Sequence, residues 1–130
     1  MSPILIFLFL LPLLTCHAKP MIHSDANAWL RKIIKKGENC PDCVRDVFEK
    51  NFKIQTCIIG IKRADFVING FLETPKKKYD YEPVKSARKS YNDPNLVYIT
   101  VDSDGFKADF KIRRASENED YKFVSGEKKC

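Results

Sequence analysis

The sequence predicts an α+β fold in which helices come first and an antiparallel sheet follows. Apolar residues between Ala26 and Ile34 recur at i, i+3, i+4, i+7 and i+8, the stripe of an amphipathic helix. Between Val97 and Ile112, apolar and polar residues alternate instead, as on strands with one face in water. After an apolar N-terminal segment, no linker, repeat or low-complexity tract interrupts the chain. Residues 19–130 should therefore form a single domain.

Length and composition exclude several classes of protein. The chain has 130 residues, of which 44% are hydrophobic and 31% charged, an ordinary globular composition. It is too short for a multidomain enzyme or a full dinucleotide-binding domain. Lys and Arg number 23 against 17 Asp and Glu, which gives a formal net charge of +6. An anionic partner is therefore a natural expectation.

The first predicted helix follows Ser24 or Asp25, either of which can cap it. Gly37 is expected to end this helix, because glycine is favoured just beyond a helix C-terminus. Its apolar stripe consists of Ala26, Trp29, Leu30, Ile33 and Ile34.

Two further helices are predicted. The second begins at Pro41, a residue suited to the first helical position. Its inner face would be formed by Cys43, Val44, Val47 and Phe48. The third begins near Arg63 and ends at Thr74-Pro75. The residues it would direct inward are Phe66, Val67, Gly70 and Phe71.

Alternation and turn residues predict the strands. Gly60 marks a bend after the first of them, and Asp102–Gly105 supplies a turn between two others. The predicted strands cover residues 52–57, 81–91, 97–101, 106–113 and 121–128.

The N-terminal segment resembles a secretory signal. Ile4–Leu14 is an apolar run of eleven residues, too short for a stable membrane-spanning helix, which needs about 20. Cys16 and Ala18 are small residues at the positions that signal peptidase recognises before its cleavage site. We interpret residues 1–18 as a signal peptide, with a membrane anchor or a buried helix as the alternatives. The mature protein is then expected to be soluble and extracellular.

Loss of this segment leaves Cys40, Cys43, Cys57 and Cys130. An even number of cysteines in a small exported domain indicates two disulfides, for which three connectivities exist. We favour Cys40–Cys43 with Cys57–Cys130. The spacing of Cys40-Pro41-Asp42-Cys43 also fits a redox dithiol, but a redox motif needs a preceding strand in a βαβ context. Metal ligation is a further alternative, although the mature chain offers only His23 as an additional ligand.

Several short motifs occur in the order found in a known family. They are Asp46-Val47-Phe48, Phe52–Cys57, Lys62–Val67, Ser86-Ala87, Leu96–Val101 and Ala108–Ile112, with Cys130 closing the last strand. Over nearly all of residues 25–130, this order resembles the small secreted nuclear transport factor 2-like proteins of nematodes. The resemblance implies a cone, in which a curved antiparallel sheet wraps around three helices and leaves a pocket at its open end. The Cys40–Cys43 motif and the run Lys76–Lys78 depart from that pattern.

Cones of this family include isomerases, dehydratases and binding proteins without catalysis, so the resemblance alone does not give a function. The enzymes use pocket carboxylates, histidines and tyrosines, for which the candidates here are Asp46, Asp65, Asp109, Tyr98 and Tyr121. Asp109 falls on the wet face of its strand, and Asp65 lies near a helix N-terminus where it should be solvated. His23 falls in the N-terminal segment. We therefore expect no catalytic residues, no cofactor and no metal.

A basic stretch is the clearest candidate for a binding surface. It comprises Lys76, Lys77, Lys78, Lys85, Arg88 and Lys89. Such a stretch can bind an anionic glycan, acidic lipid or nucleic acid, and outside the cell a sulfated glycan is favoured over nucleic acid. The alternative is a solvated loop and edge strand, because lysine also prevents edge pairing.

These observations favour a secreted, disulfide-stabilised binding module without catalysis, holding a small apolar ligand among Trp29 and the phenylalanines. Binding of a sulfated glycan through residues 76–89 is the alternative. An isomerase or dehydratase and a thiol-redox enzyme are less favoured. A homodimer formed through the sheet face is also open.

Overall fold

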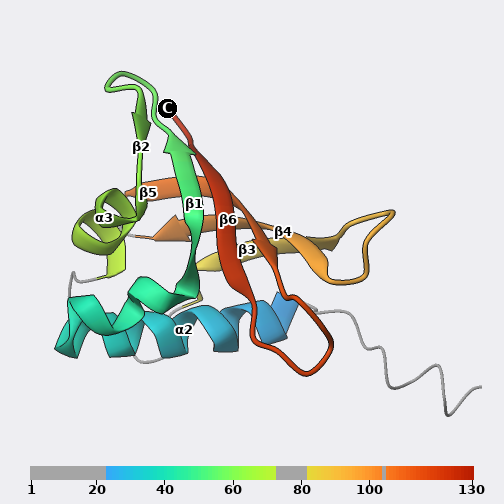
Figure 1. Cartoon of the computed structure of the whole chain (residues 1–130). Coiled ribbons are helices and arrows are strands. Elements are labelled where there is room, and N and C mark those ends of the chain that lie inside the picture. The colour runs from blue at the N-terminus through green and yellow to red at the C-terminus, as the bar shows by residue number, and fades with distance from the viewer. Residues whose placement is uncertain (1–22, 73–81, 104) are drawn as a thin grey trace, which may run out of the picture.

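The computed structural model describes residues 23–72, 82–103 and 105–130. The predicted signal peptide, the start of the predicted domain at residue 19 and the lysine run 76–78 lie outside the described residues. Within them, helical segments pack against a curved mixed sheet (Figure 1), which confirms the predicted α+β class.

Helix α2 (His23–Asn39) buries the predicted apolar stripe, with Trp29 half-buried. His23 starts this helix and is not part of a separate N-terminal segment. The prediction that Gly37 ends the helix is wrong. Gly37 is buried inside α2, where a Cβ atom would lie 3.0 Å from the carbonyl oxygen of Leu72. The glycine therefore allows a close approach between two helical segments.

The segment after α2 differs from the prediction mainly in where helix gives way to strand. A 3₁₀ helix, η1 (Pro41–Val47), begins at Pro41 as predicted. Phe48, expected on the inner face of that helix, is instead the first residue of strand β1 (Phe48–Gln55). β1 thus begins earlier than the predicted strand and ends before Thr56 and Cys57. It buries Phe48, Phe52 and Ile54.

The third helical segment is short and has two parts. Helix α3 (Ala64–Val67) continues directly into a π-helical turn, η2 (Ile68–Leu72). The buried residues of these two parts are Val67, Ile68, Phe71 and Leu72. Gly70, predicted to face inward, is exposed. The predicted end of the helix at Thr74-Pro75 lies outside the described residues.

The sheet contains six strands in the order β2-β1-β6-β5-β4-β3. Besides β1, they are β2 (Ile61–Lys62), β3 (Val84–Lys89), β4 (Leu96–Ser103), β5 (Phe106–Arg113) and β6 (Lys122–Lys128). Strands β3 to β6 form the predicted antiparallel meander. The expectation of a wholly antiparallel sheet is wrong, because β1 and β6 run parallel. Side-chain alternation is the same in both pairings, so it does not report strand direction.

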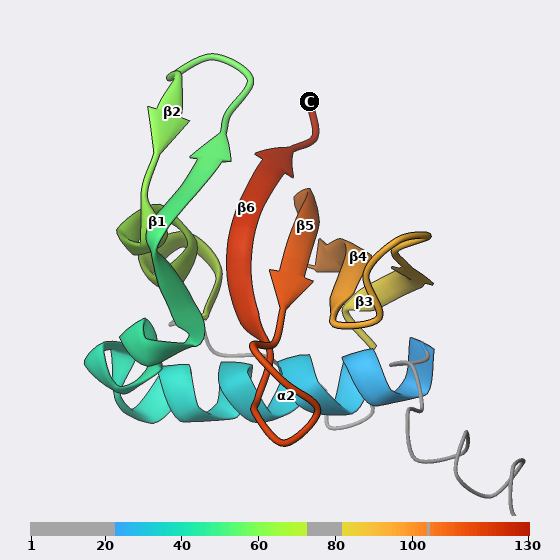
Figure 2. The same cartoon turned by 45° about the vertical axis from the view of Figure 1, so that its right-hand side comes forward.

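The sheet curves above α2, which crosses one end of it, while α3 lies beside β1 and β2 (Figure 2). Aromatic rings fill the space between the layers. Phe123 lies 4.8 Å from Phe48, 4.9 Å from Phe110 and 5.1 Å from Trp29, measured between ring centroids. The phenylalanines and Trp29 that the ligand hypothesis assigned to a cone interior therefore pack against one another.

Candidate binding groove

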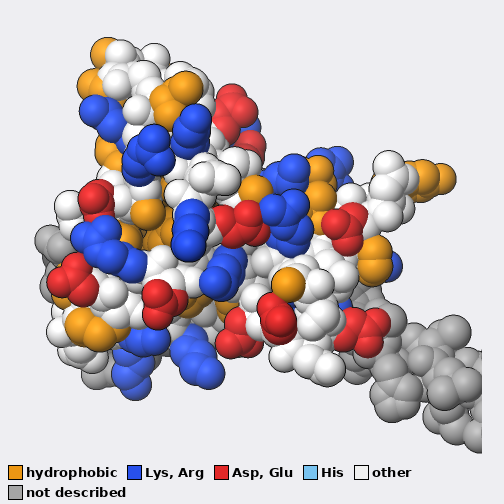
Figure 3. All heavy atoms as spheres, in the orientation of Figure 1, with side chains coloured by type: hydrophobic (Ala, Val, Ile, Leu, Met, Phe, Trp, Pro, Cys, Tyr) orange, Lys and Arg blue, Asp and Glu red, His pale blue; other side chains and the backbone are white. Residues whose placement is uncertain are grey.

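The outer face of the sheet, which faces away from the aromatic core, carries an open groove of about 520 Å³. Strands β3, β4, β5 and β6 all contribute to it. Its polar and aromatic lining consists of Ser86, Arg88, Tyr98, Thr100, Asp109, Lys111, Ser125 and Glu127. Basic and acidic side chains are intermixed on the face of the molecule shown in Figure 3. We refer to the groove lined by these residues as the outer groove.

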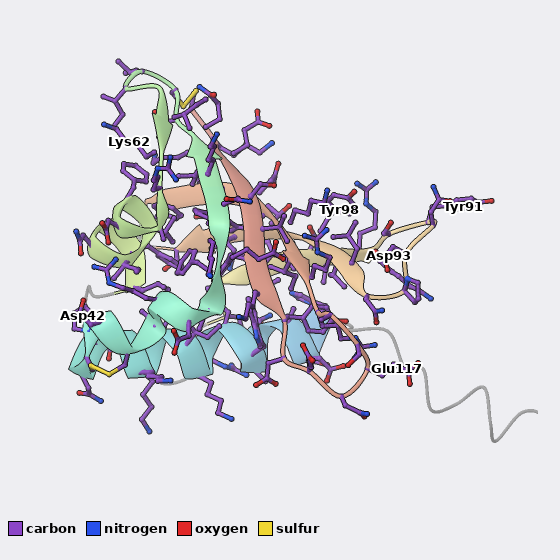
Figure 4. The ribbon with its side chains drawn as sticks, viewed as in Figure 1. Asp42, Lys62, Tyr91, Asp93, Tyr98 and Glu117 are labelled. Carbon is purple, nitrogen blue, oxygen red and sulfur yellow. A yellow bond between two sulfur atoms is a disulfide. The ribbon has the colours of Figure 1, made fainter. Side chains whose placement is uncertain are left out.

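Strand alternation explains why these side chains share one face. On β4, Val97, Ile99 and Val101 are buried, so Tyr98 and Thr100 between them face outward. Tyr98 accordingly lies on the side of β4 away from α2 (Figure 4). The register then places successive outer residues side by side across the sheet. The aligned pairs are Ser86 with Thr100, Arg88 with Tyr98, Thr100 with Asp109, Lys111 with Ser125 and Asp109 with Glu127.

Arg88 and Tyr98 form the aromatic part of the outer groove. The guanidinium carbon of Arg88 lies 5.3 Å from the centroid of the Tyr98 ring, a cation–π arrangement. Tyr98 remains 38% exposed. The ring thereby orients a permanently charged guanidinium at the solvent boundary, where its N–H groups can bind a carboxylate, sulfate or phosphate.

Asp109 forms the acidic part of the outer groove. The hydroxyl of Thr100 donates to its Oδ1 at 2.8 Å, and the ammonium of Lys129 lies 2.8 Å from its Oδ2. Partial burial by itself would raise the pKa of Asp109. The hydrogen bonds from Lys129 and Thr100 and the charge of Lys129 outweigh it, so this pKa lies below its ordinary value. Asp109 is therefore a charged acceptor, unsuited to act as a general base near neutral pH.

Replacing Asp109 with asparagine should destabilise the protein slightly at neutral pH, and the loss should shrink in strongly acidic solution. The folded-state pKa of Asp109 is depressed, so its stabilising effect is present above the unfolded value of about 3.9 and fades as pH falls through the folded value. Because the side chain is 41% exposed, the loss at pH 7 should stay below about 1 kcal/mol. Urea unfolding at pH 7 and pH 3 measures it. An Asp109→Asn deficit that is as large at pH 3 would contradict this assignment. Asp102→Asn is the control. Asp102 lies 3.9 Å from the ammonium of Lys107, a weaker ion pair, so its loss should change stability less.

The other catalytic candidates do not gather at the outer groove. Asp65 forms an exposed ion pair with Arg45, and Asp46 is exposed on η1. Tyr121 is buried before β6, and burial raises the pKa of its hydroxyl. His23 lies at the start of α2, where its Nε2 contacts the carbonyl oxygen of Val84. Tyr98 and Asp109 are the two candidates that the fold brings together.

The basic stretch predicted from the sequence does not form one surface on its described part. Arg88 aligns with the outward Tyr98, whereas Lys89 aligns with the buried Val97 and so projects to the opposite side of β3. The ammonium of Lys85 donates to the carbonyl oxygen of Glu82 at 3.0 Å. Arg88 alone of these three lines the outer groove. The groove residues that sequence reasoning missed are Ser86, Thr100, Lys111, Ser125 and Glu127.

The cysteines lie in pairs at disulfide distance. The sulfur atoms of Cys40 and Cys43 are 2.02 Å apart, and those of Cys57 and Cys130 are 2.00 Å apart. This is the pairing favoured from the sequence, and such pairs are typical of extracellular proteins. In the described part of the chain, no three or more His, Cys, Asp or Glu side chains cluster in a way that could hold a metal ion. None of the helices described is long and apolar enough to cross a membrane.

These features define an α+β protein whose curved sheet presents a polar groove on its outer face. No protein-family model matches the chain, and no curated protein sequence matches it. Among solved structures, the chain is similar to a de novo designed protein with a curved β-sheet, seen in a crystal structure. That match has a TM-score of 0.51 and 15% sequence identity, and it covers 82% of this chain and 99% of the designed chain. It supports the α+β fold with a curved sheet.

Proposed function

We propose that the protein is an extracellular, non-catalytic binding module for an acidic carbohydrate, held in the outer groove. The observation that carries the proposal is the convergence of two cationic groups, an aromatic ring, three aliphatic hydroxyls and two carboxylates on one concave surface. Sites with few, well-placed polar groups around an apolar patch are typical of ligand pockets.

Each part of the outer groove suits one part of such a ligand. The guanidinium of Arg88 and the ammonium of Lys111 can bind a sulfate or carboxylate through charge-assisted hydrogen bonds. Tyr98 offers apolar surface on which the C–H face of a sugar ring can pack. Asp109 can accept hydrogen bonds from sugar hydroxyls, because its carboxylate stays ionised near neutral pH.

The proposal keeps the anionic-glycan alternative and moves its site from residues 76–89 to the outer groove. The apolar-ligand hypothesis receives less support, because the interior aromatic rings contact one another at centroid distances of 4.8 to 6.4 Å. A thiol-redox role is not proposed, since Cys40 and Cys43 follow helix α2 and not a strand. An isomerase role is not proposed either, because Asp109, the carboxylate candidate in the outer groove, is held by Lys129 and Thr100.

Secretion and the nuclear transport factor 2-like cone are part of the same proposal. The apolar run Ile4–Leu14 and the two cysteine pairs support export. The order of helices followed by a curved sheet supports the cone.

Direct binding measurements test the function. Immobilised mature protein, residues 19–130, is titrated with a heparin-derived oligosaccharide, an uncharged oligosaccharide of equal length and a single-stranded oligonucleotide. The sulfated sugar should bind most tightly. The double variant Arg88→Ala/Lys111→Ala should weaken it by about 30-fold, as expected for the loss of two charge-assisted contacts at about 1 kcal/mol each. The matched control Lys32→Ala/Lys35→Ala removes two exposed lysines of α2 and should change binding less than about twofold.

Other outcomes would count against the proposal. Unchanged sugar binding in Arg88→Ala/Lys111→Ala would remove the outer groove as the site. Loss of binding only in Lys76→Ala/Lys77→Ala/Lys78→Ala would return the site to the basic stretch predicted from the sequence. Tighter binding of the oligonucleotide would identify nucleic acid as the ligand class.

A further inference from the structure

The β1–β2 hairpin exposes three isoleucines, two in its turn and one at the start of β2. Ile58 is 93% exposed, Ile59 57% and Ile61 62%. We call these three residues the isoleucine tip. The hairpin projects from the body of the molecule at the end that also carries the C-terminus (Figure 1). Exposed isoleucines are ordinary singly, but a contiguous group at one tip marks an interaction site.

The hairpin holds the isoleucines away from the core. The backbone N–H of Thr56 donates to the carbonyl oxygen of Gly60 at 3.0 Å and closes the turn. Gly60 has φ +79°, a left-handed conformation that glycine adopts without strain. The Cys57–Cys130 pair then fastens the base of the tip to the end of the chain after β6. The apolar side chains are therefore presented by a braced turn.

Two lysines lie on the hairpin strands below the tip. Lys62 follows Ile61 on β2 and lies high on the hairpin (Figure 4), and Lys53 is exposed on β1. We call these two lysines the basic collar. Figure 3 shows Lys and Arg side chains below the apolar side chains at this end of the molecule. Glu127 is the acidic residue of β6 next to the collar.

We propose that the isoleucine tip inserts into a negatively charged lipid bilayer while the basic collar lies among the lipid headgroups. Apolar side chains at the tip, with lysines on the strands below them, match the apolar interior and the anionic headgroups of such a membrane. A protein partner fits less well. A stable protein interface buries about 800 Å² on each side, and a narrow convex tip of three side chains does not offer that area. The three isoleucines of the tip do not line the outer groove, so the inference does not rest on sugar binding.

Vesicle co-sedimentation of the mature protein, residues 19–130, tests the inference. Binding should be strong to phosphatidylcholine vesicles with about 30% phosphatidylserine and at least about tenfold weaker to pure phosphatidylcholine. Ile58→Ser/Ile59→Ser should weaken binding by about 100-fold, because each buried isoleucine contributes about tenfold or more. Tyr91→Ser is the matched control, since Tyr91 is a fully exposed aromatic residue on the β3–β4 loop and its loss should change nothing.

A second set of measurements separates insertion from simple attraction and from self-association. Lys62→Glu should weaken binding to the charged vesicles about fivefold or more and leave binding to neutral ones unchanged. Thermal unfolding of the isoleucine and tyrosine variants should match the parent, since these side chains are exposed. The same measurement on Lys62→Glu checks that the change at this half-buried residue keeps the fold. Absence of vesicle binding, or equal binding by Ile58→Ser/Ile59→Ser, overturns the inference. Sedimentation showing a dimer that Ile58→Ser/Ile59→Ser dissolves would also overturn it, because a second copy would then cover the tip.

Discussion

Changing Cys57 and Cys130 together to serine should lower the free energy of unfolding by about 4 kcal/mol. The two cysteines are separated by 73 positions, so their link closes a loop of most of the described domain. In the chain-entropy description, a bridge stabilises the protein by restricting the unfolded chain, and the effect grows with the length of the loop. A domain of this size has only about 5–15 kcal/mol of stability to lose. Urea unfolding of the oxidised proteins measures the difference.

The Cys40–Cys43 pair supplies the matched comparison. It spans three positions, so the same description predicts a loss of about 2 kcal/mol for Cys40→Ser/Cys43→Ser. Each double variant removes the same atoms, so the contrast isolates loop length. Equal losses in the two variants, or a larger loss at Cys40–Cys43, would contradict the assigned pairing.

The position of the long-range pair adds a local expectation. β1 and β6 are parallel neighbours, and Cys57 and Cys130 lie just beyond their adjacent ends. This pairing joins strands far apart in the sequence, and no tight turn connects them. Without the link, amide hydrogen exchange should rise most at the β1–β2 turn and at the end of β6, including the base of the isoleucine tip.

Local patterns predicted the elements of the fold well. The apolar residues of α2 are buried, as their spacing predicted. The alternation at Val97, Ile99 and Val101 gives the inner face of β4. The outward placement of Asp109 was predicted from the same rule. Helix ends were predicted less well. Gly37 is needed because Leu72 packs closely against it, and Leu72 is far from Gly37 in the sequence. Packing between segments decided that position.

The outer groove was harder to predict, because it depends on register. Ser86, Thr100 and Ser125 are ordinary polar residues in the sequence, and only strand pairing places them on one surface. Charge density along the chain instead indicated residues 76–89, whose described cations separate onto different sides of β3. The parallel pairing of β1 with β6 was missed for a similar reason, since no local signal encodes it.

Asn27 is the clearest residue that the sequence patterns did not reveal. It lies on α2, is 2% exposed, and joins the helix to the backbone of β3. The N–H of Val84 donates to its Oδ1 at 2.8 Å, and its Nδ2 donates to the carbonyl oxygen of Val84 at 3.0 Å. One side chain thereby satisfies both polar groups of a buried residue at the start of an edge strand.

Asn27→Leu should therefore cost about 3 kcal/mol and lower the Tm by about 10 °C. Leucine has the same number and branching of side-chain heavy atoms but pairs with neither group. The N–H of Val84 is then buried without an acceptor, while its carbonyl oxygen keeps the contact with His23. Thermal unfolding gives the size of the effect, and amide exchange at Val84 gives its location.

Ala28→Leu is the matched control for that variant. It introduces the same side chain one position along the same helix, where Ala28 is exposed, so stability should change by less than about 0.5 kcal/mol. Similar losses at the two positions would mean that leucine perturbs α2 itself. A large loss at Asn27 with unchanged exchange at Val84 would mean that the amide acts through packing. We expect losses of both stability and amide protection, because β3 meets α2 at Val84, the residue that Asn27 binds. The same strand carries Ser86 and Arg88 into the outer groove.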